Sequence, residues 1–203
     1  MLKILDTVIG SRAYNLDREA SDWDRRSIYV VPTADLFKLQ TPPDTAESGE
    51  AMEVGRWAQL AAGGSPNPLE YLFSKYAEPL TEDGQLLLDN REVFLSKKMV
   101  PRFIGFARGN LKRYKDNPKT ILQAFRLLLT CKSLLETGVY RIEMPDSAQS
   151  TVEKIRHGEL SVYSFMDDMV DKINELEKTT SLRDEPDYEF INGLLYQIRM
   201  RHL

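Results

Sequence analysis

The first third of the chain contains short apolar runs separated by turn residues, a pattern typical of β-strands. Three such runs cover residues 4–9, 26–31 and 50–54. The first two are rich in β-branched residues, and Gly10 and Pro32 end them. The third follows a segment rich in Pro, Ser, Thr and acidic residues, which predicts an exposed loop over 42–49. The chain is therefore expected to open with a small β-sheet.

Farther along, apolar positions recur every three or four residues, which predicts helices. One helix is expected around Trp57, ending at Gly63-Gly64, and a short one over 69–74. Residues 93–111 suit one helix, or two helices separated near Pro101. Three more helices are expected over 118–137, 161–176 and 187–201. We divide the chain into a sheet-containing front part, residues 1–79, and a helical part, residues 80–203. The pattern leaves open whether the two parts share one core.

Composition narrows the class of protein. With 203 residues, of which 42% are hydrophobic, the chain can bury a sizeable core. A formal net charge of −4 argues against a surface that is basic throughout, although a local basic cleft is compatible with it. Cys131 is the single cysteine, and its leucine neighbours indicate a packed thiol in a reducing compartment. No membrane helix or signal peptide is predicted, so we expect a cytoplasmic protein with no membrane partner.

Candidate chemistry lies around the first two predicted strands. Gly10 and Ser11 follow the first strand, where small residues offer backbone N–H groups and a hydroxyl to a triphosphate. Asp22 and Asp24, spaced to share one face of a strand, can hold a divalent cation. Oxygen ligands without a Cys or His cluster indicate Mg²⁺ or Mn²⁺, as phosphoryl transfer requires. Each motif alone is also typical of a turn, a cap or a strand end, so the prediction depends on their combination.

This order of motifs resembles the DNA polymerase β-like nucleotidyltransferase superfamily. Within it, the chain resembles over nearly its whole length the predicted nucleotidyltransferases associated with bacterial and phage RNA repair. The segments that show this resemblance include Ile9-Gly10-Ser11-Arg12-Ala13-Tyr14, Ser21-Asp22-Trp23-Asp24, Ser65-Pro66-Asn67 with Leu69-Glu70, Arg126-Leu127-Leu128, Thr137-Gly138 and Pro186-Asp187-Tyr188. The resemblance implies an α+β fold: a small mixed β-sheet nucleotidyltransferase head of the polymerase β type with a C-terminal helical region.

The resemblance also implies site residues. Glu53 falls at the place of the family's third metal-binding carboxylate, with Glu50 in reserve, so Asp22, Asp24 and Glu53 are the expected catalytic metal ligands. Asn15 stands where the family usually has glycine, and asparagine tolerates a positive φ better than most residues. The expected nucleotide-binding residues are Gly10, Ser11, Arg12, Ser21, Lys119 and Arg126.

Basic residues in the helical part have two explanations. Lys119 and Arg126, seven residues apart, share one helical face and are expected to close over the phosphates or an acceptor strand. Arg102, Arg108, Lys112 and Arg113 are candidates for the same task on the preceding helix. Helices commonly display such charges as an ordinary solvated or ion-paired surface, and only Arg126, set between Phe125 and Leu127 in an apolar segment, departs from that explanation.

Three functions are compatible with the sequence. The first is a metal-dependent nucleotidyltransferase that moves a nucleoside monophosphate from a nucleoside triphosphate to an acceptor, with an RNA end favoured only by the resemblance. The second is a catalytically degenerate nucleotide- or partner-binding protein, because Glu53 and Asn15 depart from the family pattern. The third is a helical interaction module whose sheet is merely structural. The oligomeric state is left open.

Overall fold

The contacts of the chain form two compact units. The computed structural model describes residues 1–39, 51–114, 117–160 and 163–203. One unit contains Met1–Leu95 and Glu185–Leu203, and the other contains Ser96–Asp184. The boundary thus falls at Leu95 instead of the expected Pro79, because the elements just after the sheet pack against it. The last helix of the predicted helical part also belongs to the first unit. The loop predicted over 42–49 and the reserve ligand Glu50 lie outside the described residues.

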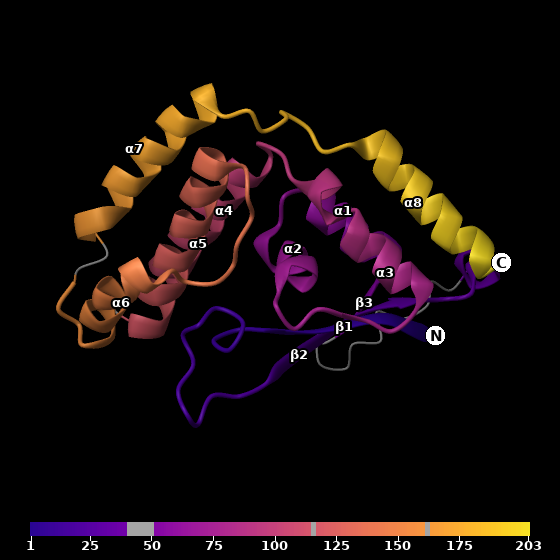
Figure 1. Ribbon diagram of the computed structural model, residues 1–203, viewed down its shortest axis with the longest axis horizontal. Coiled ribbons are helices and arrows are strands. Elements are labelled where there is room, and N and C mark those ends of the chain that lie inside the picture. The colour runs from indigo at the N-terminus through magenta and orange to yellow at the C-terminus, as the bar shows by residue number, and fades with distance from the viewer. Residues whose placement is uncertain (40–50, 115–116, 161–162) are drawn as a thin grey trace. The chain divides into compact units, whose positions relative to one another are not determined.

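The first unit is built on a four-stranded mixed sheet with the strand order β3-β2-β1-β4 (Figure 1). Strand β1 (Leu2–Ile9) pairs antiparallel with β2 (Asp24–Val30) and with β4 (Glu78–Pro79). Strand β3 (Ala51–Glu53) pairs parallel with β2. The three strands predicted from the sequence are thereby confirmed. The apolar side chains in the middle of β1 and at the end of β2, for example Ile4, Leu5 and Ile28, are buried, which explains why these two runs form strands.

Helices cover one side of this sheet, where α1, α2 and α3 lie together in Figure 1. The helical elements of the unit are η1 (Thr33–Phe37), α1 (Val54–Ala62), α2 (Pro66–Phe73), α3 (Glu82–Asp89), η2 (Arg91–Phe94) and α8 (Tyr188–Arg201). Trp57 is the largest fully buried side chain and joins three of them. Its Nε1 donates to the carbonyl of Pro68 at 2.9 Å, and its ring meets Phe94 edge-on with centroids 5.0 Å apart.

Polar contacts join the C-terminal helix α8 and the residue after it to the rest of the first unit. Arg201 Nη1 lies 2.5 Å from Asp83 Oδ1, and His202 Nε2 lies 2.8 Å from Asp83 Oδ2. Asp83 is 4% exposed, so both partners meet a carboxylate that is largely shielded from water. The backbone N–H of Thr33 also donates to the carbonyl of His202 at 2.7 Å. The unit therefore includes the end of the chain as one of its packing elements.

The second unit is helical, and α5 packs against α4, α6 and α7. Its elements are α4 (Met99–Arg113), α5 (Pro118–Thr137), η3 (Asp146–Ala148), α6 (Gln149–Arg156) and α7 (Tyr163–Thr179). Pro101 lies in the first turn of α4, where its missing N–H costs no helical bond. Helix α5 begins at Pro118 and ends before Gly138, whose φ is +72°, as the sequence predicts.

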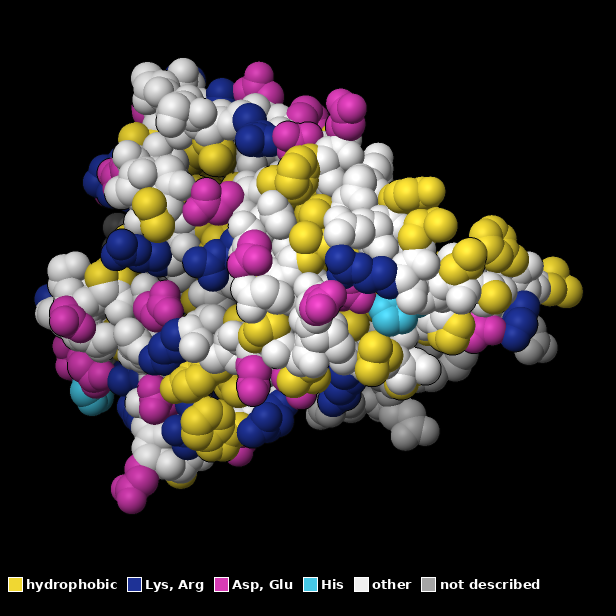
Figure 2. Space-filling view, turned by 45° about the vertical axis from the view of Figure 1, so that its right-hand side comes forward, with side chains coloured by type: hydrophobic (Ala, Val, Ile, Leu, Met, Phe, Trp, Pro, Cys, Tyr) yellow, Lys and Arg dark blue, Asp and Glu magenta, His cyan; other side chains and the backbone are white. Residues whose placement is uncertain are grey.

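The surface shown in Figure 2 has acidic and basic side chains interspersed, without one large field of either sign. This agrees with the modest net charge of −4. Among the described residues, no helix combines the length and the hydrophobicity that a membrane crossing needs.

Cys131 is expected to resist thiol reagents in the folded protein. It is 1% exposed, and burial raises the pKa of its thiol to about 12, with a smaller contribution from Glu177. Because the thiolate is the reactive form, modification by a chromogenic disulfide at pH 8 should be about a thousandfold slower than for an unfolded cysteine. Denaturant should restore rapid reaction. Rapid stoichiometric labelling of the folded chain would contradict a packed thiol.

Candidate active site

The end of β1 and the start of β2 bring the two predicted motifs together. Ile9, the last residue of β1, pairs with Asp24, the first residue of β2, so Gly10-Ser11 lies beside Asp24. Asp22 precedes the strand, and the expectation that both aspartates lie on one strand is wrong. The backbone N–H of Arg25 donates to the carbonyl of Trp23 at 2.9 Å, which bends the chain between Asp22 and the regular part of β2.

Asp22 and Asp24 are both exposed. Neither has a hydrogen-bond or ion-pair partner among the residues that the structure describes. Other carboxylates of this unit do have basic partners within 4 Å, for example Asp6 with Lys3 at 3.6 Å. Two unpaired carboxylates beside a small-residue turn leave negative charge uncompensated, as a cation site requires.

Gly10 allows Asp24 to approach the turn. Its φ is +79°, and a Cβ built on it would lie 2.2 Å from Asp24 Oδ2. Real Cβ atoms do not come so close to an oxygen, so any other residue at position 10 would displace the carboxylate or the turn. Glycine is needed here both for its backbone conformation and for the space it leaves.

Internal hydrogen bonds shape the turn that follows Gly10. The backbone N–H of Tyr14 donates to the carbonyl of Gly10 at 3.1 Å, and that of Leu16 donates to the carbonyl of Ser11 at 2.9 Å. Asn15 has a φ of 56°, the positive value that asparagine tolerates better than most residues. The backbone N–H groups of Ser11 and Arg12 have no acceptor among the described residues. No such residue therefore competes with a ligand for these two donors.

Helix α2 holds this turn in place. The hydroxyl of Tyr14 donates to Glu70 Oε2, and Glu70 is completely buried. Near the end of the helix, Ser74 Oγ donates to the carbonyl of Val8 at 2.5 Å, and Lys75 Nζ donates to Asn15 Oδ1 at 2.6 Å. This role of Glu70 was not predicted from the sequence. The available signal was an acid within the otherwise apolar run of α2, because a buried carboxylate needs a specific donor.

Burial also raises the pKa of Tyr71, the residue after Glu70 on α2. The Arg26 guanidinium opposes this shift and the Glu70 carboxylate adds to it, but burial has the larger effect. Tyr71 is 3% exposed and therefore remains a neutral phenol at physiological pH. Tyr71 thus lies within reach of the charges of both Arg26 and Glu70.

Arg12 and Ser21 shape the loop that contains Asp22. Arg12 donates to the carbonyl of Ser21 from Nε at 3.0 Å and from Nη2 at 2.6 Å. Its guanidinium also lies 4.3 Å from the centre of the Trp23 ring and 3.7 Å from Asp17 Oδ2. Ser21 Oγ accepts a hydrogen bond from the backbone N–H of Arg18 at 2.8 Å. In this structure both side chains brace the aspartate loop, and their expected contact with nucleotide stays a prediction.

Glu53 is not brought together with Asp22 and Asp24. It pairs with Tyr29, five positions along β2 from Asp24, which corresponds to about 16 Å along the strand and to the opposite face of the pleat. Its Oε2 accepts from the N–H of Gly55 at 2.7 Å and its Oε1 lies 2.6 Å from Arg199 Nη2. Glu53 thus caps α1 and joins it to α8. Among the described residues, no group of three Asp, Glu, His or Cys side chains could hold a metal ion.

Lys119 and Arg126 belong to the second unit. Lys119 is exposed in the first turn of α5, whereas Arg126 is fully buried, and its Nε lies 3.2 Å from Gln123 Oε1. The two side chains therefore differ in access to solvent, although their spacing suggested one shared face. Their expected role in nucleotide binding stays a prediction.

The fold is that of a polymerase β-like nucleotidyltransferase. It has a small mixed sheet, glycine and serine after the first strand, and an aspartate pair at the second strand. The chain belongs to the RlaP family, described as an RNA repair pathway DNA polymerase beta family, whose model matches residues 3–197. It is also similar to the uncharacterized protein YcgL of Bacillus subtilis (strain 168), with 24% identity over 92% of this chain and 85% of that protein. No solved structure matches the chain. The family assignment confirms the resemblance found in the sequence.

Replacing Gly10 with alanine tests the close approach of Asp24. Gly138→Ala is a matched control, because Gly138 also has a positive φ of +72° but nothing lies within 4 Å of a Cβ built on it. We expect Gly138→Ala to lower the free energy of unfolding by about 1 kcal/mol and Gly10→Ala by at least about 1 kcal/mol more. Urea unfolding measures both values. Equal losses for the two variants would show that position 10 has room for a side chain.

Replacing Glu53 separates a structural role from a metal-binding one. Glu53→Gln should lower the free energy of unfolding by about 2 kcal/mol, because it leaves the shielded Arg199 without its carboxylate partner. The double variant Glu53→Gln/Arg199→Gln should lose less than the sum of the single variants. Asp24→Asn, which removes an unpaired exposed charge, should change this free energy by less than about 0.5 kcal/mol. An unchanged free energy for Glu53→Gln together with lost Mn²⁺ binding would assign Glu53 to the metal instead.

Proposed function

We propose that this protein is a metal-dependent nucleotidyltransferase that transfers a nucleoside monophosphate from a nucleoside triphosphate to the end of an RNA. The observation that supports this most directly is that the carboxylates of Asp22 and Asp24 are exposed and have no partner among the described residues, with Asp24 beside the Gly10-Ser11 turn. Membership of the polymerase β-like family supports the reaction class, and the family's description supports RNA as the acceptor.

Each part of the site has a task in this proposal. Asp22 and Asp24 would hold Mg²⁺ or Mn²⁺, since their oxygen donors suit a hard cation. Such an ion, when bound, neutralises phosphate charge and lowers the pKa of an attacking hydroxyl. The N–H groups of Ser11 and Arg12 and the hydroxyl of Ser11 are donors available to triphosphate oxygens. Arg12, Tyr14 and Glu70 act as positioning residues, because they hold the aspartate loop and the turn in shape.

The reaction itself is a displacement at the α-phosphorus. The acceptor hydroxyl oxygen forms a bond to this phosphorus while the bond to the β-phosphate oxygen breaks. Pyrophosphate leaves, and the hydroxyl proton passes to solvent. The chain's contribution is to orient the triphosphate against a turn whose geometry is fixed before substrate binds.

A catalytically degenerate nucleotide-binding protein is the second candidate. Glu53 favours it, because the structure places this carboxylate away from the aspartate pair and in contact with Arg199. Such a protein would bind a nucleoside triphosphate in the presence of Mg²⁺ or Mn²⁺ without releasing pyrophosphate.

Transfer of label from each α-labelled nucleoside triphosphate to single-stranded RNA, in Mg²⁺ or Mn²⁺, tests the proposal. Asp22→Asn/Asp24→Asn should reduce transfer at least a hundredfold, because it removes the proposed cation ligands. Asp167→Asn/Asp168→Asn on α7 is the matched control: it removes two exposed acids outside the site and should leave transfer unchanged. Metal-dependent nucleotide binding without transfer would support the degenerate protein. Absence of both would contradict each candidate.

A further inference from the structure

Helix α4 differs in charge from the rest of the chain. Over Met99–Arg113 it contains no acidic residue, in a protein whose net charge is −4. It has four basic residues, all exposed: Arg102, Arg108, Lys112 and Arg113. None of them has an ion-pair or hydrogen-bond partner within the described part of the chain. Other exposed basic residues of the second unit do have such partners, for example Lys178 with Glu175 at 2.7 Å. The local positive charge of α4 is therefore left uncompensated.

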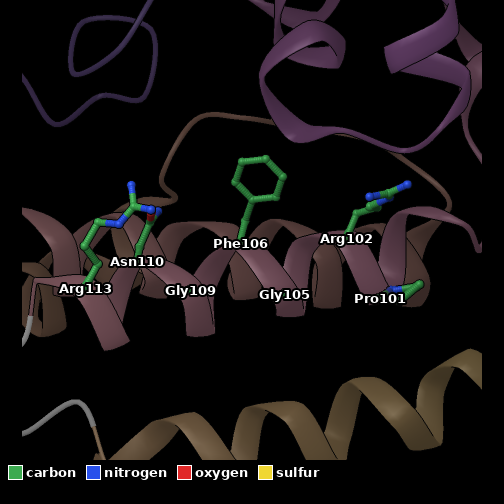
Figure 3. A pocket seen from close by; sticks show the side chains of 7 residues that line it. All are labelled: Pro101, Arg102, Gly105, Phe106, Gly109, Asn110 and Arg113. Carbon is green, nitrogen blue, oxygen red and sulfur yellow. The ribbon is translucent and has the colours of Figure 1, made fainter.

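One side of α4 combines this charge with an exposed aromatic ring. Figure 3 shows Arg102, Phe106, Asn110 and Arg113 projecting from the same side of the helix. Phe106 is 41% exposed, although phenylalanine is usually buried. We call these four residues, with Gly105 and Gly109 between them, the basic–aromatic face of α4.

The two glycines leave the basic–aromatic face hollow. Nothing lies within 4 Å of a Cβ built on Gly105 or Gly109, and a hollow of about 430 Å³ lies over this face. Glycine inside a helix costs about 1 kcal/mol relative to alanine, so two of them on one exposed face weaken the helix without improving its packing. Their effect is to uncover the flanks of Phe106 and the backbone beside it.

The spacing of these groups matches the chemistry of a single nucleic-acid strand. Phe106 is four residues from Arg102 and seven from Arg113, or about 6 Å and 10 Å along the helix axis. An uncovered ring can stack on an unpaired base, while guanidinium groups on both sides contact phosphates. A protein partner would need a broader apolar surface than the single large hydrophobic side chain of this face provides.

We propose that the basic–aromatic face binds a single-stranded segment of an RNA acceptor, with a base stacked on Phe106 and phosphates contacted by Arg102 and Arg113. The choice of RNA rests on the proposed function. The face itself is inferred from charge, exposure and shape, and it needs neither the aspartate pair nor a bound nucleotide.

Fluorescence anisotropy of the full-length protein with a labelled 12-nucleotide single-stranded RNA tests this proposal. Phe106→Ala should weaken binding about tenfold, because it removes one base–aromatic stack. Arg102→Gln/Arg113→Gln should lower the slope of log K against log salt by about 1.4, or about 0.7 for each phosphate contact. Lys172→Gln is the matched control: it removes one exposed charge from α7 of the same unit, and Lys172 is not among the residues proposed to contact RNA or nucleotide. It should change the affinity less than threefold, and thermal unfolding should show that all variants fold.

Defined outcomes would overturn the proposal. These are an unchanged affinity for Phe106→Ala, an equal loss for Phe106→Ala and Lys172→Gln, or binding of an acidic peptide but of no RNA. The Asp22→Asn/Asp24→Asn protein separates this inference from the proposed function, because it should bind RNA normally. RNA binding that depends on Phe106 without any transfer would contradict the proposed function alone. Transfer with an unchanged KM for RNA in Phe106→Ala would contradict this inference alone.

Discussion

The carboxylate of Asp24 lies where a side chain on residue 10 would otherwise stand, since a Cβ there would be 2.2 Å from its Oδ2. This contact requires glycine at the end of β1, and it accompanies the pairing of Ile9 with Asp24. A register slip of one residue would turn the buried side chains of both strands to the wrong face. The β1–β2 register therefore determines which residues meet at the candidate site. It also determines which side of β2 stays available for pairing with β3. The turn, the aspartate loop and α2 are built around this one junction.

Acidic residues near the two ends of β2 differ in their exposure and in their ion pairing. At its start, Asp22 and Asp24 are exposed and have no basic partner among the described residues. Beside its far end, Glu53 is paired with Arg199, with side chains 14% and 17% exposed. A shielded, paired carboxylate stabilises the fold but is costly to release, whereas an exposed unpaired one adds little stability and remains available to a cation. The fold thus separates carboxylates that hold helices together from carboxylates suited to a ligand.

Local signals in the sequence were enough to predict the three main strands, the glycine end of α5 and the positive φ of Asn15, because each depends on a few neighbouring residues. The position of Glu53 was beyond such signals. It depends on how β3 aligns with β2, although residues 31–50 separate the two strands, and on Arg199 from the other end of the chain. The expected division near Pro79 differs from the boundary of the compact units for the same reason, since helical spacing identifies α8 as a helix but not the helices α1 and α3 against which it packs.

A nearly neutral surface creates a problem for a protein proposed to act on two polyanions. The aspartates repel a triphosphate until a cation compensates them, so charge at the site favours nucleotide only together with metal. An RNA strand needs positive charge that is present all the time, and α4 concentrates it by excluding acidic residues from fifteen successive positions. Separate elements can thus attract the two substrates by different means, one dependent on divalent metal and the other on fixed arginines. A uniformly basic surface would remove that distinction, because it would bind both polyanions and unrelated nucleic acids alike.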